Sequence, residues 1–563
     1  MSALEQAKYH IFSRVTAIIG NDSLVDDIII DYPPESSLGD LSLACFVLAK
    51  INKQSPVAMA QDLASKLKSD DIIAEARALG PYVNFILNPD WLWPKVIAEA
   101  HAKHYGANDS GEGNQVMIEY SNANTHKEYH IGHLRNIAYG DSVAKLLAAN
   151  GYKTTKVSFI NDFGIHVAKA LWQLKQSPEA PQDGYNLGLL YTQASQAIDK
   201  DDQAKQAVGQ IMKNIEARQG EDYKLWQTTR QWSLDYFASI YRQLKIKFDQ
   251  YYYESDLVDE GRQAVSKLLE QGVLKKSEGA VIADLEEYGL GVLVFLRSDG
   301  TALYPVADLA LAVKKFSSKN LQRSLYVVDK RQSLYFQQLF KVLELSGYRA
   351  RLEHLSYDFV RLPDGAMSSR LGRVITFKDL YEEVLAKITA ETKARHADWS
   401  SKLIATTGAI MAVGVLKFEM IKVGASKIIT FDTKEALRFD GFTSVYLQYT
   451  GARINSVLAK AKAKIKPDKI KTKLLTEATE KALLLAVAKF PIIVKEAGAA
   501  SDPSIVAKYL FDLSRLFNDY YHATPIIQDN KDLQSARLAL VSGVLMVLDR
   551  GLSLLGIELV DKM

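Results

Sequence analysis

The sequence predicts a multidomain α/β protein, in which an open α/β sheet lies between an N-terminal α+β region and a C-terminal helical bundle. A strand, a long helix and a second strand follow one another within residues 116–160, which is the pattern of a βαβ unit. Further strand patterns return at 279–356, and from about residue 400 onwards the pattern is wholly helical. These three observations predict the fold class.

The composition is that of an ordinary globular protein. The chain has 563 residues, enough for three or four domains of roughly 150 residues each. Hydrophobic residues make up 48% and charged residues 24%. The single cysteine, Cys45, excludes a disulfide framework or a thiolate zinc site within one chain. Because the net charge is only +3, nucleic-acid binding would require positive charge that is gathered locally.

The N-terminus gives no targeting signal. The first twenty residues lack the long apolar run and the small-residue cleavage site of a secretory signal. No stretch reaches the ~18 consecutive apolar residues that a membrane-spanning helix needs. We therefore expect a cytoplasmic protein that does not enter a membrane.

Residues 1–108 are predicted to form the N-terminal α+β domain. Residues 41–50 and 57–68 have the three-to-four spacing of amphipathic helices. The segment 80–87 begins with Gly-Pro and continues as a strand pattern, which predicts a turn leading into a strand. The run GANDSGEGN at 106–114 is rich in turn-forming residues and is a candidate linker.

Residues 109–385 are predicted to form the central domain. An apolar strand at 116–120 is followed by a helix from about Ile131 to Asn150, which Gly151 is well placed to end. The next strand lies at 156–160. This βαβ unit should have a right-handed crossover.

The rest of the central domain is predicted to contain a helical insertion and further strands. Residues from about 165 to 275 are mostly helical and polar, as expected of an insertion. Strand patterns then occur at 279–284, 291–297, 324–329 and 352–356, with a helix at about 333–346. In open α/β sheets, ligands bind beyond the carboxyl ends of the strands.

Residues 386–563 are predicted to form a helical domain. The run 533–555 is apolar nearly all round, as expected of a buried bundle helix. The stretch 460–473 contains seven lysines and one aspartate. It is either a solvated linker or a grip on phosphate groups.

The sharpest motif is His130-Ile131-Gly132-His133, which follows a strand and begins a helix. A helix N-terminus attracts phosphate, and two histidines three residues apart can donate to the same phosphates. Gly132 would let a flat base lie on the backbone. The pattern indicates a nucleotide site, and the alternative is a pair of exposed helix histidines.

A second motif, residues 366–373, reads Ala-Met-Ser-Ser-Arg-Leu-Gly-Arg. Its two hydroxyls, two guanidinium groups and glycine suit a flexible, cationic loop that clamps pyrophosphate. A solvated polar loop is the alternative. Its position after the histidine motif is what a nucleotide site requires.

A third set gathers acidic, amide and aromatic side chains near predicted strand ends. Such a set suits a guanidinium ligand, which has five donors and no acceptor. Carboxylates accept it bidentately, and a ring can cover its face. Each residue alone could be a cap or a surface residue. The set consists of Glu119, Asn124, Tyr304, Asp308 and Gln332.

These motifs resemble those of class I arginyl-tRNA synthetases, and the resemblance extends over essentially the whole chain. The signature segment comprises Glu119 to Asn124, Lys127 and His130 to Asn136. Other similar segments are 38–40 and 80–85 in the N-terminal domain, 299–308 in the arginine-binding part, and 446–454 and 536–563 in the anticodon-binding bundle.

The resemblance implies a Rossmann-like catalytic domain, an N-terminal domain that binds the tRNA elbow and an all-α anticodon-binding domain. It implies activation of L-arginine by ATP to arginyl-adenylate, and transfer to the 3′-terminal adenosine of tRNA(Arg). Mg²⁺ is expected with the nucleotide, without a dedicated protein metal site. We expect a monomer. The alternatives are a class I ligase for another small molecule and a catalytically weak tRNA-binding or regulatory paralogue.

The resemblance also implies roles for single residues. The catalytic residues would be Lys127, His130, His133 and Arg370. The ATP-binding residues would be His130, Gly132, His133, Met367, Ser368, Ser369 and Gly372. Arginine would be held by Glu119, Asn124, Tyr304, Asp308 and Gln332. The tRNA would be contacted by Asn84, Phe85, Tyr446, Tyr449 and Tyr520, with Tyr521 as a further stacking candidate.

The chain departs from the family pattern at several positions. Ser369-Arg370 replaces the usual second lysine of the pyrophosphate loop, and Lys127 is the lysine thought to take over in this family. Three further departures are Ala123 for proline, Ala307 for arginine and Tyr335 for histidine.

Overall fold

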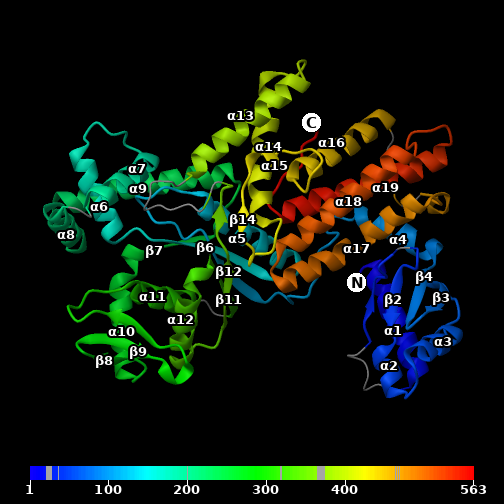
Figure 1. Ribbon diagram of the computed structural model, residues 1–563, viewed down its shortest axis with the longest axis horizontal. Coiled ribbons are helices and arrows are strands. Elements are labelled where there is room, and N and C mark those ends of the chain that lie inside the picture. Colours follow the sequence, from blue (N-terminus) through cyan, green and yellow to red (C-terminus); the bar gives the residue numbers. More distant parts are fainter. Residues whose placement is uncertain are drawn as a thin grey trace.

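The computed structural model describes the chain except residues 21–27, 36, 199–200, 317–319, 364, 366–374, 463–464, 466 and 468–469. The predicted pyrophosphate loop, 366–373, therefore lies outside the described residues, as does part of the lysine-rich stretch 460–473. Figure 1 shows the N-terminal region in blue against one end of a helical bundle, and the sheet-bearing central part on the opposite side.

The N-terminal region is a four-stranded antiparallel sheet covered by helices. The strands stand in the order β1 (Ile30–Asp31), β2 (Leu41–Ala44), β4 (Tyr82–Leu87) and β3 (Ile73–Leu79). The helices are α1 (Ala3–Ile19), α2 (Phe46–Ile51), α3 (Pro56–Lys66) and α4 (Pro89–His101). The helix predicted at 57–68 and the strand predicted at 80–87 are confirmed.

The prediction of one helix over 41–50 was wrong in its first half. Residues 41–44 form β2, which pairs with β4 through Leu41 and Phe85, and α2 begins only at Phe46. Apolar residues at 41 and 43 fit both a helical and an alternating pattern. The pairing with β4, which no local pattern encodes, selects the strand.

The central sheet has five parallel strands in the order β12-β11-β5-β6-β7. Their bounds are β5 (Gln115–Glu119), β6 (Lys153–Ile160), β7 (Gln250–Tyr253), β11 (Leu321–Asp329) and β12 (Arg351–Tyr357). Helix α5 (Ile131–Ala149) connects β5 to β6, so the predicted βαβ unit is confirmed. Gly151 follows α5 with φ +83°, as expected where a helix ends.

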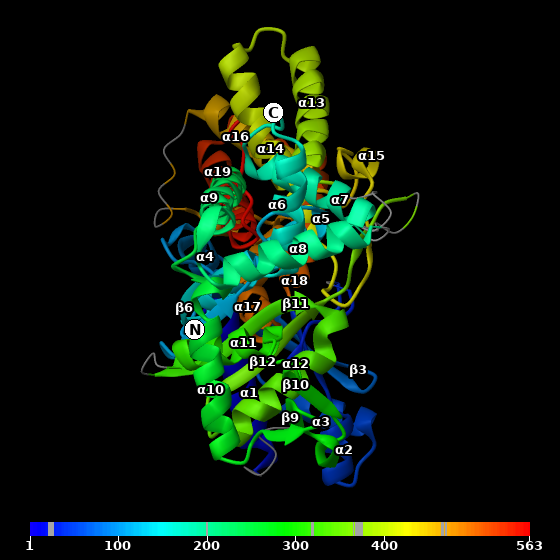
Figure 2. The ribbon, with the colours of Figure 1, turned by 90° about the vertical axis from the view of Figure 1, so that its left-hand side faces the viewer.

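Strand β7 was not predicted. The helices α6 (Ile165–Gln176), α7 (Gly184–Ile198), α8 (Asp202–Glu216) and α9 (Gly220–Gln243) precede it, and α10 (Val258–Glu270) follows it. Figure 2 shows α6, α7 and α8 in front of the bundle. β7 is a four-residue edge strand with an exposed Gln250 and Tyr251, and the three consecutive tyrosines at 251–253 are the sequence signal that could have marked it.

The strands predicted at 279–284 and 291–297 exist but belong to a separate sheet. β10 (Val292–Leu296), β9 (Ala280–Asp284) and β8 (Lys275–Ser277) form a three-stranded antiparallel sheet. The short connection between β9 and β10 permits only an antiparallel pair, since parallel neighbours need a crossover of about a dozen residues. This sheet shares a core with α11 (Tyr304–Phe316) and α12 (Ser333–Leu345).

The C-terminal part is helical and begins earlier than predicted. Its helices are α13 (Phe377–Arg395), α14 (Ser401–Ile421), α15 (Thr433–Ala436), α16 (Ser444–Ala461), α17 (Ala478–Ala500), α18 (Pro503–Ala523) and α19 (Lys531–Leu554). A two-residue strand, β14 (Ile429–Thr430), pairs with β13 (Val360–Arg361). Among the described helices, α14 alone is long and apolar enough to cross a membrane, and 72% of its apolar window is buried inside the protein.

Helix α5 lies between the sheet and the bundle. Its residues are buried along nearly the whole helix rather than on one stripe. Asn150, just beyond its end, donates from Nδ2 to the carbonyl oxygen of Val494 in α17 at 2.9 Å. The bundle therefore packs directly on the helix whose first turn carries His130 and His133.

Candidate functional site

The histidine motif forms the first turn of α5, beyond the carboxyl end of β5. His130 is the N-cap, with φ −113° and ψ 174°, and its Nδ1 accepts the backbone N–H of Gly132 at 3.0 Å. Nδ1 of His133 accepts the backbone N–H of His130 at 3.1 Å. Because both Nδ1 atoms accept, each neutral ring carries its proton on Nε2. Two Nε2–H donors are thus set side by side, with ring centroids 3.9 Å apart.

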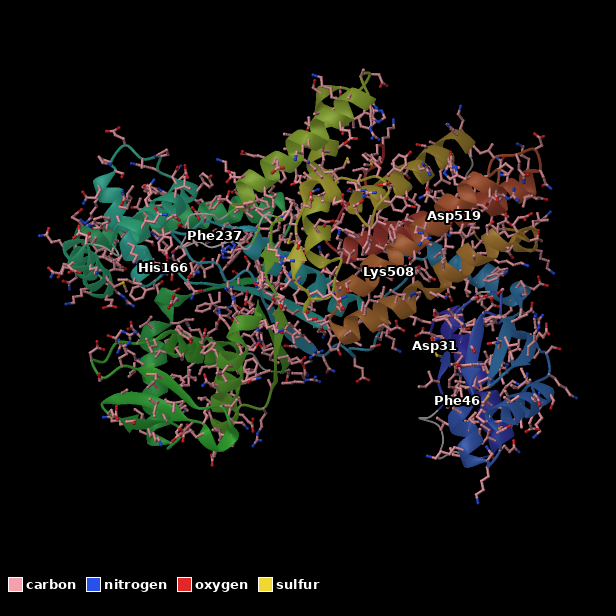
Figure 3. All side chains as sticks on the ribbon, in the orientation of Figure 1. Asp31, Phe46, His166, Phe237, Lys508 and Asp519 are labelled. Atoms are coloured by element: carbon pink, nitrogen blue, oxygen red, sulfur yellow. The ribbon has the colours of Figure 1, made fainter. Side chains whose placement is uncertain are left out.

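Tyr129 anchors this turn. Its ring is buried against Phe237 of α9, which Figure 3 labels, with centroids 5.9 Å apart. Its hydroxyl lies 3.0 Å from Oγ of Ser121, which follows β5. Packing in the core therefore fixes the position of Tyr129, and this also fixes where the adjacent His130 begins the helix.

Both histidines are neutral at physiological pH. Burial, together with the charges of Lys127 and Arg331, lowers the pKa of His130 to about 4. Burial also lowers the pKa of His133 well below its usual range, with His130 and Lys127 adding to the effect. These rings donate hydrogen bonds but carry no charge. Lys127 supplies a positive charge, and its Nζ lies 4.9 Å from the ring centroid of Tyr191 in α7.

The loop 366–373 lies outside the described residues, but the chain that follows it returns to the histidine motif. The backbone N–H of Ile131 donates to the carbonyl oxygen of Ile375 at 3.3 Å, and that of Phe377 donates to Tyr129 at 2.7 Å. Thr376 and His130 form an isolated antiparallel β-bridge through their backbones. The residues next to this loop are therefore anchored at the start of α5.

Glu119, at the end of β5, is engaged inside the protein. One carboxylate oxygen forms a buried ion pair with Nζ of Lys315 in α11. The other accepts from Nδ2 of Asn122 at 2.8 Å. Lys315 was not predicted, and it lies 196 residues from Glu119 in the chain.

Asp308 lies on the same helix as Lys315 and next to two aromatic rings. The hydroxyl of Tyr335 donates to its Oδ2, and the rings of Tyr304 and Tyr335 are T-shaped with centroids 4.6 Å apart. Burial raises the pKa of Asp308 to about 7, and the negative charge of Glu119 opposes its ionisation further. At Tyr335, where the resembling family commonly has histidine, this chain places a hydrogen-bond donor to Asp308.

A third carboxylate, Glu254, was missed by the sequence argument. It follows β7 directly, and its Oε2 accepts from Nδ2 of Asn161 at 3.2 Å. Burial raises the pKa of Glu254 to about 7, and the charges of Asp162 and Asp308 add to this. Neither Asp308 nor Glu254 has an ion-pair partner among the residues that the structure describes. Locating β7 would have placed Glu254 at a strand end.

The predicted arginine-binding residues fall into two groups. Asn124 bridges to Asn161, which contacts Glu254, so Asn124 joins the cluster of Asp308, Tyr304 and Glu119. Gln332 lies beyond the carboxyl end of β11 and is exposed, and within the described part of the chain no side-chain hydrogen bond joins it to the other four residues.

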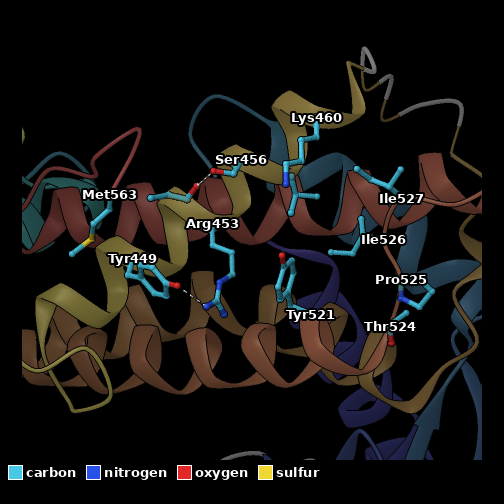
Figure 4. A pocket seen from close by; sticks show the side chains of 12 residues that line it. Tyr449, Arg453, Ser456, Lys460, Tyr521, Thr524, Pro525, Ile526, Ile527 and Met563 are labelled. Carbon is cyan, nitrogen blue, oxygen red and sulfur yellow. Dashed lines mark hydrogen bonds between the residues drawn. The ribbon is translucent and has the colours of Figure 1, made fainter. Parts of the chain in front are cut away.

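The bundle contains a pocket of about 560 Å³ between α16, α18 and the C-terminal residue (Figure 4). Arg453 lies at its centre, with its guanidinium carbon 4.7 Å from the ring centroid of Tyr449 and 5.1 Å from that of Tyr521. It also donates to the Tyr449 hydroxyl at 2.9 Å. Lys460 and Met563 line the same pocket. An aromatic and cationic lining of this kind suits a nucleobase with its phosphate.

Two of the residues predicted to contact tRNA do not line this pocket. Tyr520 is 0% exposed and belongs to the core, whereas Tyr521 is 37% exposed and lines the pocket. Neighbouring residues of a helix point about 100° apart, so only one of them can face the pocket. Tyr446 packs on Phe511 and accepts from Asn518 at 2.9 Å, away from the pocket lining.

The residues predicted to contact tRNA in the N-terminal domain are buried. Asn84 is buried, and Phe85 is 0% exposed, because β4 is an inner strand of its sheet. Tyr82 of the same strand is 42% exposed, and its ring is T-shaped to the exposed Phe46 at 5.9 Å. Phe46 is labelled in Figure 3 on the outer end of this domain.

A parallel sheet with a His-x-Gly-His helix start beyond its central strand, backed by a helical bundle, defines a class I aminoacyl-tRNA synthetase. Residues 96–424 match the family described as "tRNA synthetases class I (R), catalytic domain". Residues 447–563 match the DALR anticodon binding domain, and residues 5–87 match the arginyl tRNA synthetase N terminal domain.

Relatives that match over nearly their full length identify the family within this class. The arginine–tRNA ligase of Bdellovibrio bacteriovorus is 35% identical over 546 residues, which are 94% of this chain and 93% of that protein. That of Halothermothrix orenii is 32% identical, with 96% and 97% covered. The Thermus thermophilus arginyl-tRNA synthetase structure superposes with a TM-score of 0.80 at 26% identity, covering 95% of this chain and 96% of that one. The chain belongs to the arginyl-tRNA synthetase family.

Proposed function

We propose that this chain uses ATP to join L-arginine to the 3′-terminal adenosine of tRNA(Arg). One observation carries the proposal: Asp308 and Glu254, two carboxylates that form no ion pair with any described residue, lie at the same edge of the sheet as the histidine-bearing start of α5. A cationic amino acid and a triphosphate would meet there. Membership of the family supports the same reaction.

Asp308 and Glu254 would bind the guanidinium group of arginine. Its five N–H donors need acceptors, and ionised carboxylates accept them in a charge-assisted way. Tyr304 and Tyr335 form an aromatic wall beside Asp308 that would cover the guanidinium plane. Asn124 and Gln332, on either side of the sheet's central strands, would hold the amino acid backbone.

The first turn of α5 would hold the phosphates of ATP. The Nε2–H groups of His130 and His133, whose rings lie side by side, would donate to these phosphates, and the glycine between them would leave room for a base. Lys127 would add positive charge. Met367, Ser368, Ser369, Arg370 and Gly372, which lie outside the described residues, would contact the nucleotide as the resemblance implies.

The reaction would proceed in two displacements without a protein nucleophile. The carboxylate of arginine attacks the α-phosphorus of ATP, and pyrophosphate leaves. A ribose hydroxyl of the terminal adenosine then attacks the carbonyl carbon of the adenylate, and AMP leaves. The protein contributes alignment and charge compensation. We propose that Mg²⁺ would enter with ATP and would offset the charge of its phosphates.

The tRNA would be held at two further places. Tyr449, Tyr521 and Arg453 would take an anticodon base in the pocket of the bundle. Tyr82 and Phe46 would stack on the tRNA elbow, in place of the buried Asn84 and Phe85. We propose that the enzyme works as a cytoplasmic monomer.

Pyrophosphate exchange into ATP, measured with and without tRNA, tests the proposal. We expect exchange that depends on arginine, with lysine and citrulline as controls. Citrulline keeps the shape of arginine and loses the charge. Exchange with lysine or citrulline at the same rate would refute the proposal and favour a class I ligase for another small molecule. Binding of tRNA without any arginylation would refute it in favour of a tRNA-binding paralogue.

A further inference from the structure

We propose that Lys315 is a positioning residue for the cationic substrate: its buried ammonium holds Glu119 as an internal ion pair, and leaves Asp308 and Glu254 to face the guanidinium group. This inference rests on the proposed function and goes beyond it, because it removes Glu119 from direct contact with the guanidinium. In its place, Lys315 of α11 becomes the ion-pair partner of Glu119.

The ion pair is fully enclosed. The side chain of Lys315 is 0% exposed and that of Glu119 is 3% exposed. The ammonium also lies 4.0 Å from the ring centroid of Tyr326 in β11. Both carboxylate oxygens of Glu119 already accept a hydrogen bond, one from Lys315 and one from Asn122. A buried charge needs such partners, and removing one of them is costly.

Lys315 and Asp308 lie seven residues apart on α11, and therefore on the same face of the helix, about 10 Å apart along its axis. Their charges influence one another, since Lys315 favours and Glu119 opposes ionisation of Asp308. Lys315 thus neutralises Glu119 by an ion pair, whereas it forms no ion pair with Asp308.

The charge balance gives the physical reason for this arrangement. Without Lys315, three carboxylates would face one guanidinium group in a buried site, and like charges there hold protons. With Lys315, the charge of Glu119 is cancelled. The other titratable or charged groups around the cluster are Asp162 with Arg230, Tyr252, Tyr304, Tyr326 and Tyr335.

The test compares three variants in arginylation of tRNA. Lys315→Met leaves Glu119 buried without its ion-pair partner, so we expect the arginine KM to rise roughly tenfold or more at neutral pH. We also expect the pH at which the arginine KM begins to rise on acidification to be higher than in the wild type. Lys315→Arg keeps the charge, and we expect it to restore most of the affinity. The KM for ATP should change less than twofold, because the phosphate-binding turn is not part of the ion pair.

The double variant Glu119→Gln/Lys315→Met is decisive. It removes both charges, so we expect its arginine KM, and the pH at which that KM begins to rise on acidification, to return close to those of the wild type. A double variant that keeps a strongly raised arginine KM would show that Glu119 binds the guanidinium directly, and would overturn the inference. An unchanged pH profile in Lys315→Met would do so as well.

Folding and the proposed function are controlled separately. Thermal melting of each variant reports its folding, and if Lys315→Met does not fold, the arginine KM of the double variant alone decides. A wild-type enzyme without arginine-dependent charging would refute the proposed function. An active wild type with a defective double variant would refute only the role of Lys315.

Discussion

Asp308 and Glu254 are the two residues of the proposed arginine site whose ionisation state would determine how tightly arginine binds. In the empty protein, burial raises the pKa of each to about 7, and the charge of Asp308 adds to the effect at Glu254. A bound guanidinium group would stabilise both charged forms and lower both pKa values. Arginine binding is therefore expected to release protons near neutral pH.

We predict that the arginine KM rises as the pH falls through about 7. Because the ionised carboxylates bind the cation, the affinity for arginine is highest above the raised pKa values and decreases as the pH falls below them. Arginylation kinetics between pH 6 and 8.5 measure this, with the KM for ATP as the internal reference. A constant arginine KM over that range contradicts the predicted protonation.

We predict that Asp308→Asn raises the arginine KM by roughly 10- to 100-fold, because hydrogen bonds to a charged group contribute about 1.5–3 kcal/mol. The KM for ATP should stay nearly constant. Asp259→Asn is a suitable control, because Asp259 forms an exposed ion pair with Arg218 and belongs to none of the site's hydrogen bonds described above. A matched rise in both KM values would argue against the assignment of Asp308 to arginine.

At the scale of single elements, the first turn of α5 combines a helix N-terminus with two neutral imidazoles. Each ring caps the helix through Nδ1 and presents Nε2–H. We predict that His130→Ala lowers adenylate formation by about 10²-fold, as loss of one preorganised donor typically does. Binding of tRNA should persist, and filter binding measures it. Equal loss of adenylate formation and tRNA binding would indicate a structural role.

Helix α18 presents one of two adjacent tyrosines to the bundle pocket. We predict that Tyr521→Ala weakens tRNA binding by roughly 5- to 100-fold, since base stacking contributes about 1–3 kcal/mol. Pyrophosphate exchange measured at saturating tRNA should change little. Tyr520→Phe is the matched control, because it removes a buried hydroxyl that has no partner among the described residues. Equal effects of the two substitutions would contradict the pocket assignment.

At the scale of the whole molecule, a polar contact ties the bundle and the C-terminal segment to α5. Nζ of Lys417 in α14 donates to the carbonyl oxygen of Gly556 at 2.9 Å and lies 3.8 Å from Asp141 of α5. Lys145 pairs with the same aspartate at 2.7 Å. Gly556 has φ +71°, and an added Cβ would lie 2.9 Å from Asp141 Oδ2 and from Lys417 Nζ.

We predict that Gly556→Ala destabilises the protein by about 1–2 kcal/mol from its backbone conformation alone, and by more because Asp141 and Lys417 must move. Gly289→Ala is the control, since Gly289 has φ +70° and nothing within 4 Å of an added Cβ. Thermal melting of both variants separates the crowding from the backbone term. Equal shifts would mean that the polar contact does not constrain the C-terminal segment.

The sequence by itself determined the features that depend on neighbouring residues. The βαβ unit, the histidine turn and the bundle helices each follow from local spacing, because periodicity and helix ends are set within a few residues. Asp308 was predicted from its residue type and its place in a motif. The family was also predicted, because segments that resemble it occur along essentially the whole chain.

Only the tertiary structure decided which side chains meet and which are buried. Glu254 became part of the site through β7, a short edge strand, and Lys315 reached Glu119 across 196 residues. Phe85 and Tyr520 were assigned to tRNA through the family resemblance, yet packing buries both. Burial and charge pairing depend on distances in the folded chain, and these distances are absent from local sequence patterns.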